Sequence, residues 1–199
     1  AELFGVPGIE ADREVINLLA SALAAAGIAR IHLDLGHVGI YRALVAGAGL
    51  AGNGESDAIF DALRVKDRPA VAALTSRLPR AWGDALVALT TLYGPAQEVL
   101  SAARRELPDV PAIANALATL ADLAASATSR VQALDVDLGD LRGYHYHNGV
   151  IFTAYAPGSP TALGNGGRYD GIGRAFGRSR PATGFTLYLR QLTDLVAEA

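Results

Sequence analysis

Two short stretches hold most of the side chains that could do chemistry. One is LRGYHYHNGVIF, residues 141–152, and the other is GNGGRYDGIGRAFG, residues 164–177. The first combines an arginine with tyrosines and histidines, and the second places Arg-Tyr-Asp directly after a run of glycines. Arginine binds carboxylates, an acid binds an ammonium group, and tyrosine rings pack against an apolar body. Together with Glu2, these residue types predict a pocket for a small zwitterion.

The glycines themselves do not match a nucleotide-binding signature. GIGRAFG misses the spacing of the dinucleotide fingerprint by one residue, and the sequence contains no phosphate-loop motif. We therefore expect sharp turns and close backbone approach at the glycines. Arg168 and Asp170 have a simpler alternative, which is pairing with neighbouring side chains. Asp12 and Glu14 fit ordinary charges of a first helical turn.

Metal and serine chemistry have little support. His145 and His147 are two residues apart and would share a face on a strand, but no third ligand is placed by the sequence. Lining of a pocket is the better interpretation, so we expect no metal and no cofactor. The G-x-S-x-G motif of serine hydrolases is absent from the sequence.

The elements that position these residues follow from hydrophobic periodicity. A helix is predicted from about Asp12 with Gly27 as its C-cap, and alternation of Ile31, Leu33 and Leu35 predicts a strand. A short helix starts near Ile40. Further helices are predicted between prolines and at the C-terminus, and further strands around two alternating stretches: helices 55–64, 68–77, 80–92, 95–106, 110–132 and 190–198, and strands 150–155 and 182–189.

This order predicts an α+β fold with an antiparallel sheet, flanking helices and a helical insertion. We divide the chain into a first core segment (1–53), the insertion (54–133) and a second core segment (134–199), with the Gly-rich stretch as a loop. The chain contains no methionine. We therefore expect a fragment, or a sequence that lacks some residues.

Composition excludes several classes. Hydrophobic residues make up 51% and charged residues 19% of the chain, which is typical of a globular protein. The net charge of −3 argues against nucleic-acid binding, and no apolar run reaches the roughly 20 residues that cross a bilayer. The first residues are acidic where a signal peptide is basic, and cysteine is absent. We expect a cytoplasmic protein.

Three motifs resemble class II histidyl-tRNA synthetases. GGRYDGIGRAFG followed by PATGFTLYLRQL resembles the end of their catalytic domain, and LRGYHYHNGVIF resembles their histidine-specific segment. AELFG followed by ADREVINLLASAL resembles the stretch after their second motif, so the first two motifs would precede Ala1. The resemblance implies a class II core and a histidine pocket formed by Glu2, Arg142, Tyr146, His147, Gly166, Gly167, Arg168 and Tyr169.

Departures from the synthetase pattern bear on function. Tyr188 stands where the third motif has its second glycine, Gln191 stands at its ATP-binding arginine, and Thr153 replaces an acid. Segments of the type G-Y-H-Y-H and A-T-G-F-x-L-x-L-R resemble the synthetase-like regulatory subunits of short-form ATP phosphoribosyltransferase. That resemblance implies a non-catalytic role in histidine biosynthesis, with the short catalytic subunit as partner, L-histidine as effector and a homodimer through the core.

Three alternatives remain, one of which is an α+β scaffold that retains no ligand pocket. The chain could be a genuine histidyl-tRNA synthetase, or a fragment of one, that activates histidine with ATP. It could also be a histidine-binding module with a different partner.

Overall fold

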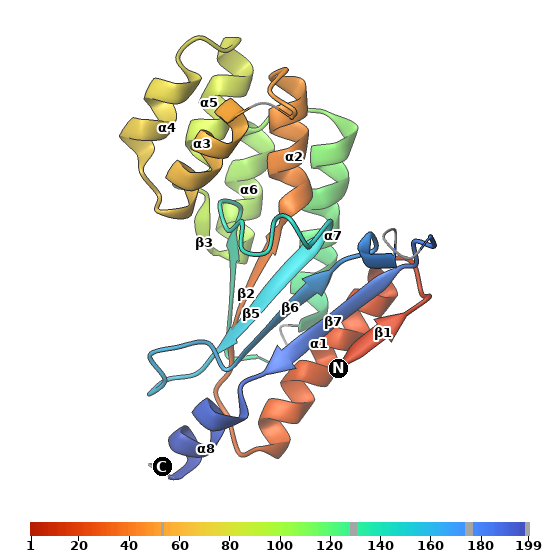
Figure 1. The fold of residues 1–199 in the computed structure, drawn as a ribbon. Coiled ribbons are helices and arrows are strands. Elements are labelled where there is room, and N and C mark those ends of the chain that lie inside the picture. Colours follow the sequence, from red (N-terminus) through yellow and green to blue (C-terminus); the bar gives the residue numbers. More distant parts are fainter. Residues whose placement is uncertain (53, 128–130, 174–176, 198–199) are drawn as a thin grey trace.

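A mixed seven-stranded sheet forms the centre of the molecule in the computed structural model, which describes residues 1–52, 54–127, 131–173 and 177–197 (Figure 1). The strands are β1 (Glu2–Phe4), β2 (His32–His37), β3 (Tyr93–Pro95), β4 (Ala133–Asp137), β5 (Val150–Tyr155), β6 (Gly164–Arg168) and β7 (Ala182–Leu187). Their order across the sheet is β1-β7-β6-β5-β2-β4-β3. The helices are α1 (Ile9–Ala25), α2 (Val38–Gly47), α3 (Gly54–Arg64), α4 (Arg68–Thr75), α5 (Arg80–Ala88), α6 (Ala96–Glu106), α7 (Pro111–Ala127) and α8 (Leu189–Ala197).

The expected α+β class with flanking helices is confirmed, but the sheet is not antiparallel throughout. β2 and β4 pair in parallel, whereas the other neighbouring strands of the described residues are antiparallel. The chain leaves β2 through α2 and returns to β4 only after α7, and a parallel pair requires a long crossover of this kind. β1, β3 and β4 were not predicted, because segments of three to five residues carry too little alternation.

The predicted Gly-rich loop is partly a strand. Residues Gly164–Arg168 form β6 between β5 and β7. A Cβ on Gly166 would lie 2.1 Å from the carbonyl oxygen of Gly184 and 2.6 Å from the Phe152 ring. Glycine is therefore needed here because the neighbouring strand and ring come so close. Residues 174–176 of the same stretch lie outside the described residues.

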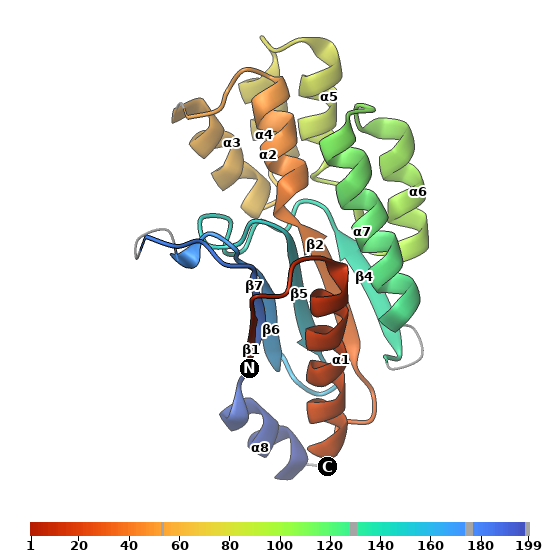
Figure 2. The same ribbon diagram turned by 90° about the vertical axis from the view of Figure 1, so that its right-hand side faces the viewer.

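One face of the sheet is apolar and packs on α1 and α7 (Figure 2). Leu35 pairs with Phe152 across β2 and β5, and both side chains are buried. A Cβ on Gly164 would contact Leu19 of α1, which places that helix against the same face. Cross-strand partners share a face. The opposite face therefore carries a different row of residues across β4, β2, β5, β6 and β7: Asp135, Asp34, Thr153, Asn165 and Thr186.

The predicted helices of residues 54–133 are present; α3 and α6 end where predicted, whereas α4 and α5 end two and four residues earlier. α3, α4 and α5 pack together at one end of the sheet (Figure 1), whereas α6 and α7 also contact its strands. α5 ends at Ala88, where Thr90 and Thr91 turn their hydroxyls back onto helix carbonyls. Residues 128–130 of the predicted 110–132 helix, residue 198 of the last helix and the boundary at residue 53 lie outside the described residues. The three-segment division stays a prediction.

In the described part of the chain, none of the helices has both the length and the apolar character needed to cross a membrane.

Candidate functional site

A cavity of about 360 Å³ opens on the polar side of the sheet, where β1, β6 and β7 meet the turn that precedes β5. It brings together five of the eight predicted site residues: Glu2, Tyr146, His147, Gly166 and Tyr169. The sequence analysis missed the other lining residues, which are Ala1, Asn165, Gly184, Phe185 and Thr186. Alternation within β6 and β7 could have found Asn165 and Thr186, which are cross-strand partners.

Tyr169 and Glu2 form the polar centre of this cavity. The Tyr169 hydroxyl donates a hydrogen bond of 2.8 Å to Oε1 of Glu2. Tyr169 is buried, and burial together with the Glu2 carboxylate raises the pKa of its phenol. The phenol therefore stays protonated and holds one carboxylate oxygen of Glu2 in place. Glu2 itself is exposed at the edge of the cavity and can receive a cationic group.

Aromatic rings form the adjoining wall. The Tyr146 and Tyr169 rings are 4.7 Å apart at an angle of 30°, and the His147 ring meets Tyr146 edge-on at 5.1 Å. Burial lowers the pKa of His147, so its imidazole is neutral near pH 7. This wall can pack against a planar ring, and a neutral imidazole can accept or donate a hydrogen bond.

Two glycines make room for the His147 ring. A Cβ on Gly143, which has a φ of +66°, would lie 2.3 Å from Nδ1 of His147. A Cβ on Gly167 would lie 2.7 Å from Cδ2 of the same ring. Gly167 thus shapes the cavity through His147, although it does not line the cavity itself.

Arg168 faces the opposite side of the sheet. Its Nε lies 3.0 Å from the Asp12 carboxylate, one terminal nitrogen lies 3.1 Å from Asp170, and the other donates to the Gly8 carbonyl at 2.7 Å. The prediction that Arg168 lines the pocket is wrong, and its alternative, pairing with neighbours, is what the structure shows.

Asp12 is not an ordinary first-turn charge. α1 begins at Ile9, earlier than predicted, and the Asp12 side chain is buried beneath the sheet against Arg168. Burial disfavours the charged form of both groups and raises the pKa of Asp12. The hydrogen bonds between the two side chains favour the charged forms and raise the pKa of Arg168. The pair fixes α1 to β6.

Arg142 also lies outside the cavity. Its guanidinium makes a bidentate contact with Asp140, in which Nε lies 3.0 Å from Oδ1 and a terminal nitrogen lies 2.6 Å from Oδ2, and it donates a hydrogen bond of 3.1 Å to the Tyr155 hydroxyl. The contact with Asp140 raises its pKa further. About half of its side-chain surface remains exposed. No guanidinium of the described residues is among the groups that line the cavity.

The two histidines of the 141–152 stretch do not share a face. Residues 142–146 form turns where a strand was assumed. His145 packs against the rings of Phe60 and Tyr144, whereas His147 packs against Tyr146 and Tyr169.

Tyr188 lies at the border of the cavity. Its hydroxyl is 3.1 Å from Oδ1 of Asn165, which lines the cavity and pairs with Thr153 in β5. The phenol thus contacts the polar face of the sheet through Asn165.

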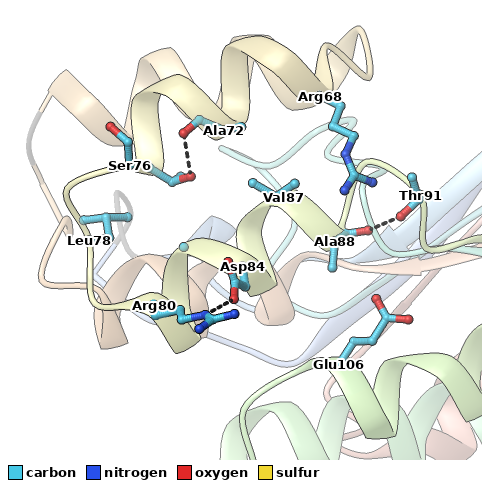
Figure 3. Close-up of a pocket in the computed structure, with 12 residues that line it drawn as sticks. Arg68, Ala72, Ser76, Leu78, Arg80, Asp84, Val87, Ala88, Thr91 and Glu106 are labelled. Carbon is cyan, nitrogen blue, oxygen red and sulfur yellow. Dashed lines mark hydrogen bonds and ion pairs between the residues drawn. The ribbon is translucent and has the colours of Figure 1, made fainter.

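A second, larger cavity of about 450 Å³ lies between α4, α5 and the end of α6 (Figure 3). Its charged groups are Arg68, Arg80, Asp84 and Glu106, with an ion pair of 3.2 Å between Arg80 and Asp84. None of the predicted site residues lines it.

Comparison with known proteins gives one family match and several relatives. The family model described as histidyl-tRNA synthetase matches residues 1–192. The ATP phosphoribosyltransferase regulatory subunit of Ralstonia nicotianae is 52% identical over 195 residues, which cover 98% of this chain and 50% of that protein. The chain thus spans about half the length of this curated relative.

Two solved structures share the fold. An ATP phosphoribosyltransferase regulatory subunit/histidyl-tRNA synthetase from Bacillus halodurans matches with a TM-score of 0.84 and 28% identity, over 98% of this chain and 52% of that one. The ATP phosphoribosyl transferase (HisG:HisZ) complex from Thermotoga maritima matches with a TM-score of 0.71 and 16% identity, over 94% and 63% of the chains. The latter likeness concerns the fold alone.

Proposed function

The chain belongs to the histidyl-tRNA synthetase family, and from that premise we propose that it serves as a non-catalytic regulatory subunit of short-form ATP phosphoribosyltransferase. That enzyme carries out the first step of histidine biosynthesis. The names of the Ralstonia and Bacillus relatives support this assignment. Its partner is the short catalytic subunit, with which it works in the cytoplasm, and the class II-like core forms a homodimer.

The observation that carries the proposal is the state of the cavity. The Glu2–Tyr169 hydrogen bond and the wall of Tyr146 and His147 form an amino-acid-sized pocket. Beside it, Tyr188 contacts Asn165. In the pattern that the chain resembles, Tyr188 stands where the synthetases have a glycine, and the neutral Gln191 stands where they have an ATP-binding arginine. Binding without activation is the function that fits this combination.

L-histidine is the effector in this account. Its ammonium group pairs with Glu2, and its imidazole packs against the Tyr146 ring and exchanges a hydrogen bond with neutral His147. Regulation is then a coupling free energy: histidine favours one arrangement of the complex and so changes the activity of the partner.

Assembly with the catalytic subunit tests this function. The purified protein and the short catalytic subunit are mixed, and phosphoribosyl transfer from phosphoribosyl pyrophosphate to ATP is measured together with the mass of the complex. We expect a stable complex and a gain in activity. Neither complex nor gain would overturn the proposal.

A genuine synthetase is the second candidate, because the family model itself carries that description. Histidine-dependent exchange between ATP and pyrophosphate distinguishes the two. Robust exchange would favour the synthetase, whereas histidine binding in calorimetry without exchange favours the regulatory subunit. Histidine binding with no response of the catalytic subunit would point to a module with another partner.

A further inference from the structure

A cluster of one histidine and two aspartates lies on the polar face of the sheet, away from the cavity. The parallel register of β2 and β4 places Asp34 beside Asp135, and His32 precedes Asp34 by two residues on the same face. Oxygen atoms of both carboxylates and a ring nitrogen of His32 all lie within 4.8 Å of one another.

The geometry of the cluster is that of converging ligand atoms. Nε2 of His32 lies 3.2 Å from Oδ1 of Asp34 and 3.1 Å from Oδ2 of Asp135. This nitrogen is buried and has no hydrogen-bond partner of acceptable geometry. Two ligands about 2.1 Å from a metal ion, at angles between tetrahedral and octahedral, are separated by roughly 3.0–3.4 Å. The spacing around His32 falls within that range.

The surrounding charges favour a cation. Lys66 is engaged by Asp137, and Arg142 by Asp140 and Tyr155. The two carboxylates face one another around His32, and a bound cation relieves their mutual repulsion.

We propose that His32, Asp34 and Asp135 bind one divalent transition-metal ion through Nε2, Oδ1 and Oδ2, with water completing the coordination. One imidazole and two carboxylates suit zinc among the common ions. The site is separate from the histidine cavity but shares a cross-strand row with it, because Asp34 pairs with Thr153 and Thr153 with Asn165. It does not depend on the proposed function.

Zinc binding to the chelator-treated protein tests the site. Calorimetry with ZnCl₂ at pH 7.5 is carried out on the natural protein and on His32→Gln and Asp135→Asn. His145→Gln is the matched control, because His145 is an exposed histidine that packs on Phe60 outside the cluster. We expect one zinc event that both cluster variants weaken at least about tenfold, worth ~1.4 kcal/mol, and that the control retains.

Thermal unfolding provides a second readout that remains informative if a variant is less stable. Zinc raises the Tm of the natural protein and of His145→Gln, and leaves the Tm of His32→Gln unchanged. An equal zinc affinity in natural protein and cluster variants would overturn the proposal. The absence of zinc binding to the natural protein would also overturn it.

Discussion

Replacement of Arg168 by alanine separates a structural role from a ligand-binding role. The sequence predicted that this guanidinium lines the pocket, whereas the structure buries it against Asp12 on the far side of the sheet. Removing it leaves the Asp12 carboxylate, which is 2% exposed, without its partner. Breaking a buried ion pair from one side costs about 3–5 kcal/mol.

The free energy of unfolding in urea measures this cost. We expect Arg168→Ala to lose about 3–5 kcal/mol. Asp12→Asn should lose less, because Arg168 then keeps its contacts with Asp170 and the Gly8 carbonyl. The double variant Asp12→Asn/Arg168→Met should lose less than the sum of the single losses, since neither charge then remains buried alone.

Arg80→Ala is the matched control. Its guanidinium is exposed and pairs with the exposed Asp84, so we expect a loss below about 1 kcal/mol. If Arg168→Ala unfolds within about 1 kcal/mol of the natural protein but loses histidine binding, the structural role is refuted and the sequence prediction stands.

Three further substitutions test separate parts of the structure. Burial lowers the pKa of His37 from 6.5 to about 4. Below pH 6.5 this histidine is protonated in the unfolded chain but stays neutral in the folded chain. The free energy of unfolding therefore falls by ~2 kcal/mol from pH 7 to pH 5. Nδ1 of His37 accepts a hydrogen bond from the Gly39 N–H at the start of α2, and His37→Asn keeps an acceptor there without titrating. Urea melts at both pH values should show that the loss disappears in this variant, and an unchanged pH slope would contradict the reasoning. Gly166→Ala drives a methyl group into the carbonyl of Gly184, and a loss of at least about 1–3 kcal/mol is expected by thermal unfolding, where a neutral result would show that the strands can separate. Tyr169→Phe removes the bond to Glu2; stability should fall by about 1 kcal/mol and histidine affinity by about tenfold in calorimetry, and unchanged affinity would place the amino acid elsewhere.

The helices could be predicted from the sequence more completely than the strands of the sheet. Prolines and apolar periodicity located α3 to α7, and alternation located β2, β5 and β7. β4 was not predicted because its partner β2 lies about a hundred residues earlier, as the pairing of His32 with Ala133 shows, and only tertiary pairing defines so short a strand. β6 was assigned to a loop because glycines normally interrupt strands, whereas here the close approach of Phe152 and Gly184 requires them.

The residues of the candidate site could also be predicted only in part from the sequence. The family likeness brought Glu2, Tyr146, His147 and Tyr169 together correctly around one cavity. It could not reveal which side of the sheet Arg168 faces, because that depends on the register of β6. Asp12 resembled a surface charge for a related reason, since its burial follows from the packing of α1 beneath that strand.

The response of the catalytic subunit tests the central claim most directly. Phosphoribosyl transfer is measured at a fixed concentration of the short catalytic subunit while this protein is added, with and without histidine. A regulatory subunit predicts activity that rises to saturation at a defined ratio and falls when histidine is present. A rate that stays at the level of the catalytic subunit alone, at every ratio and with or without histidine, would contradict the account.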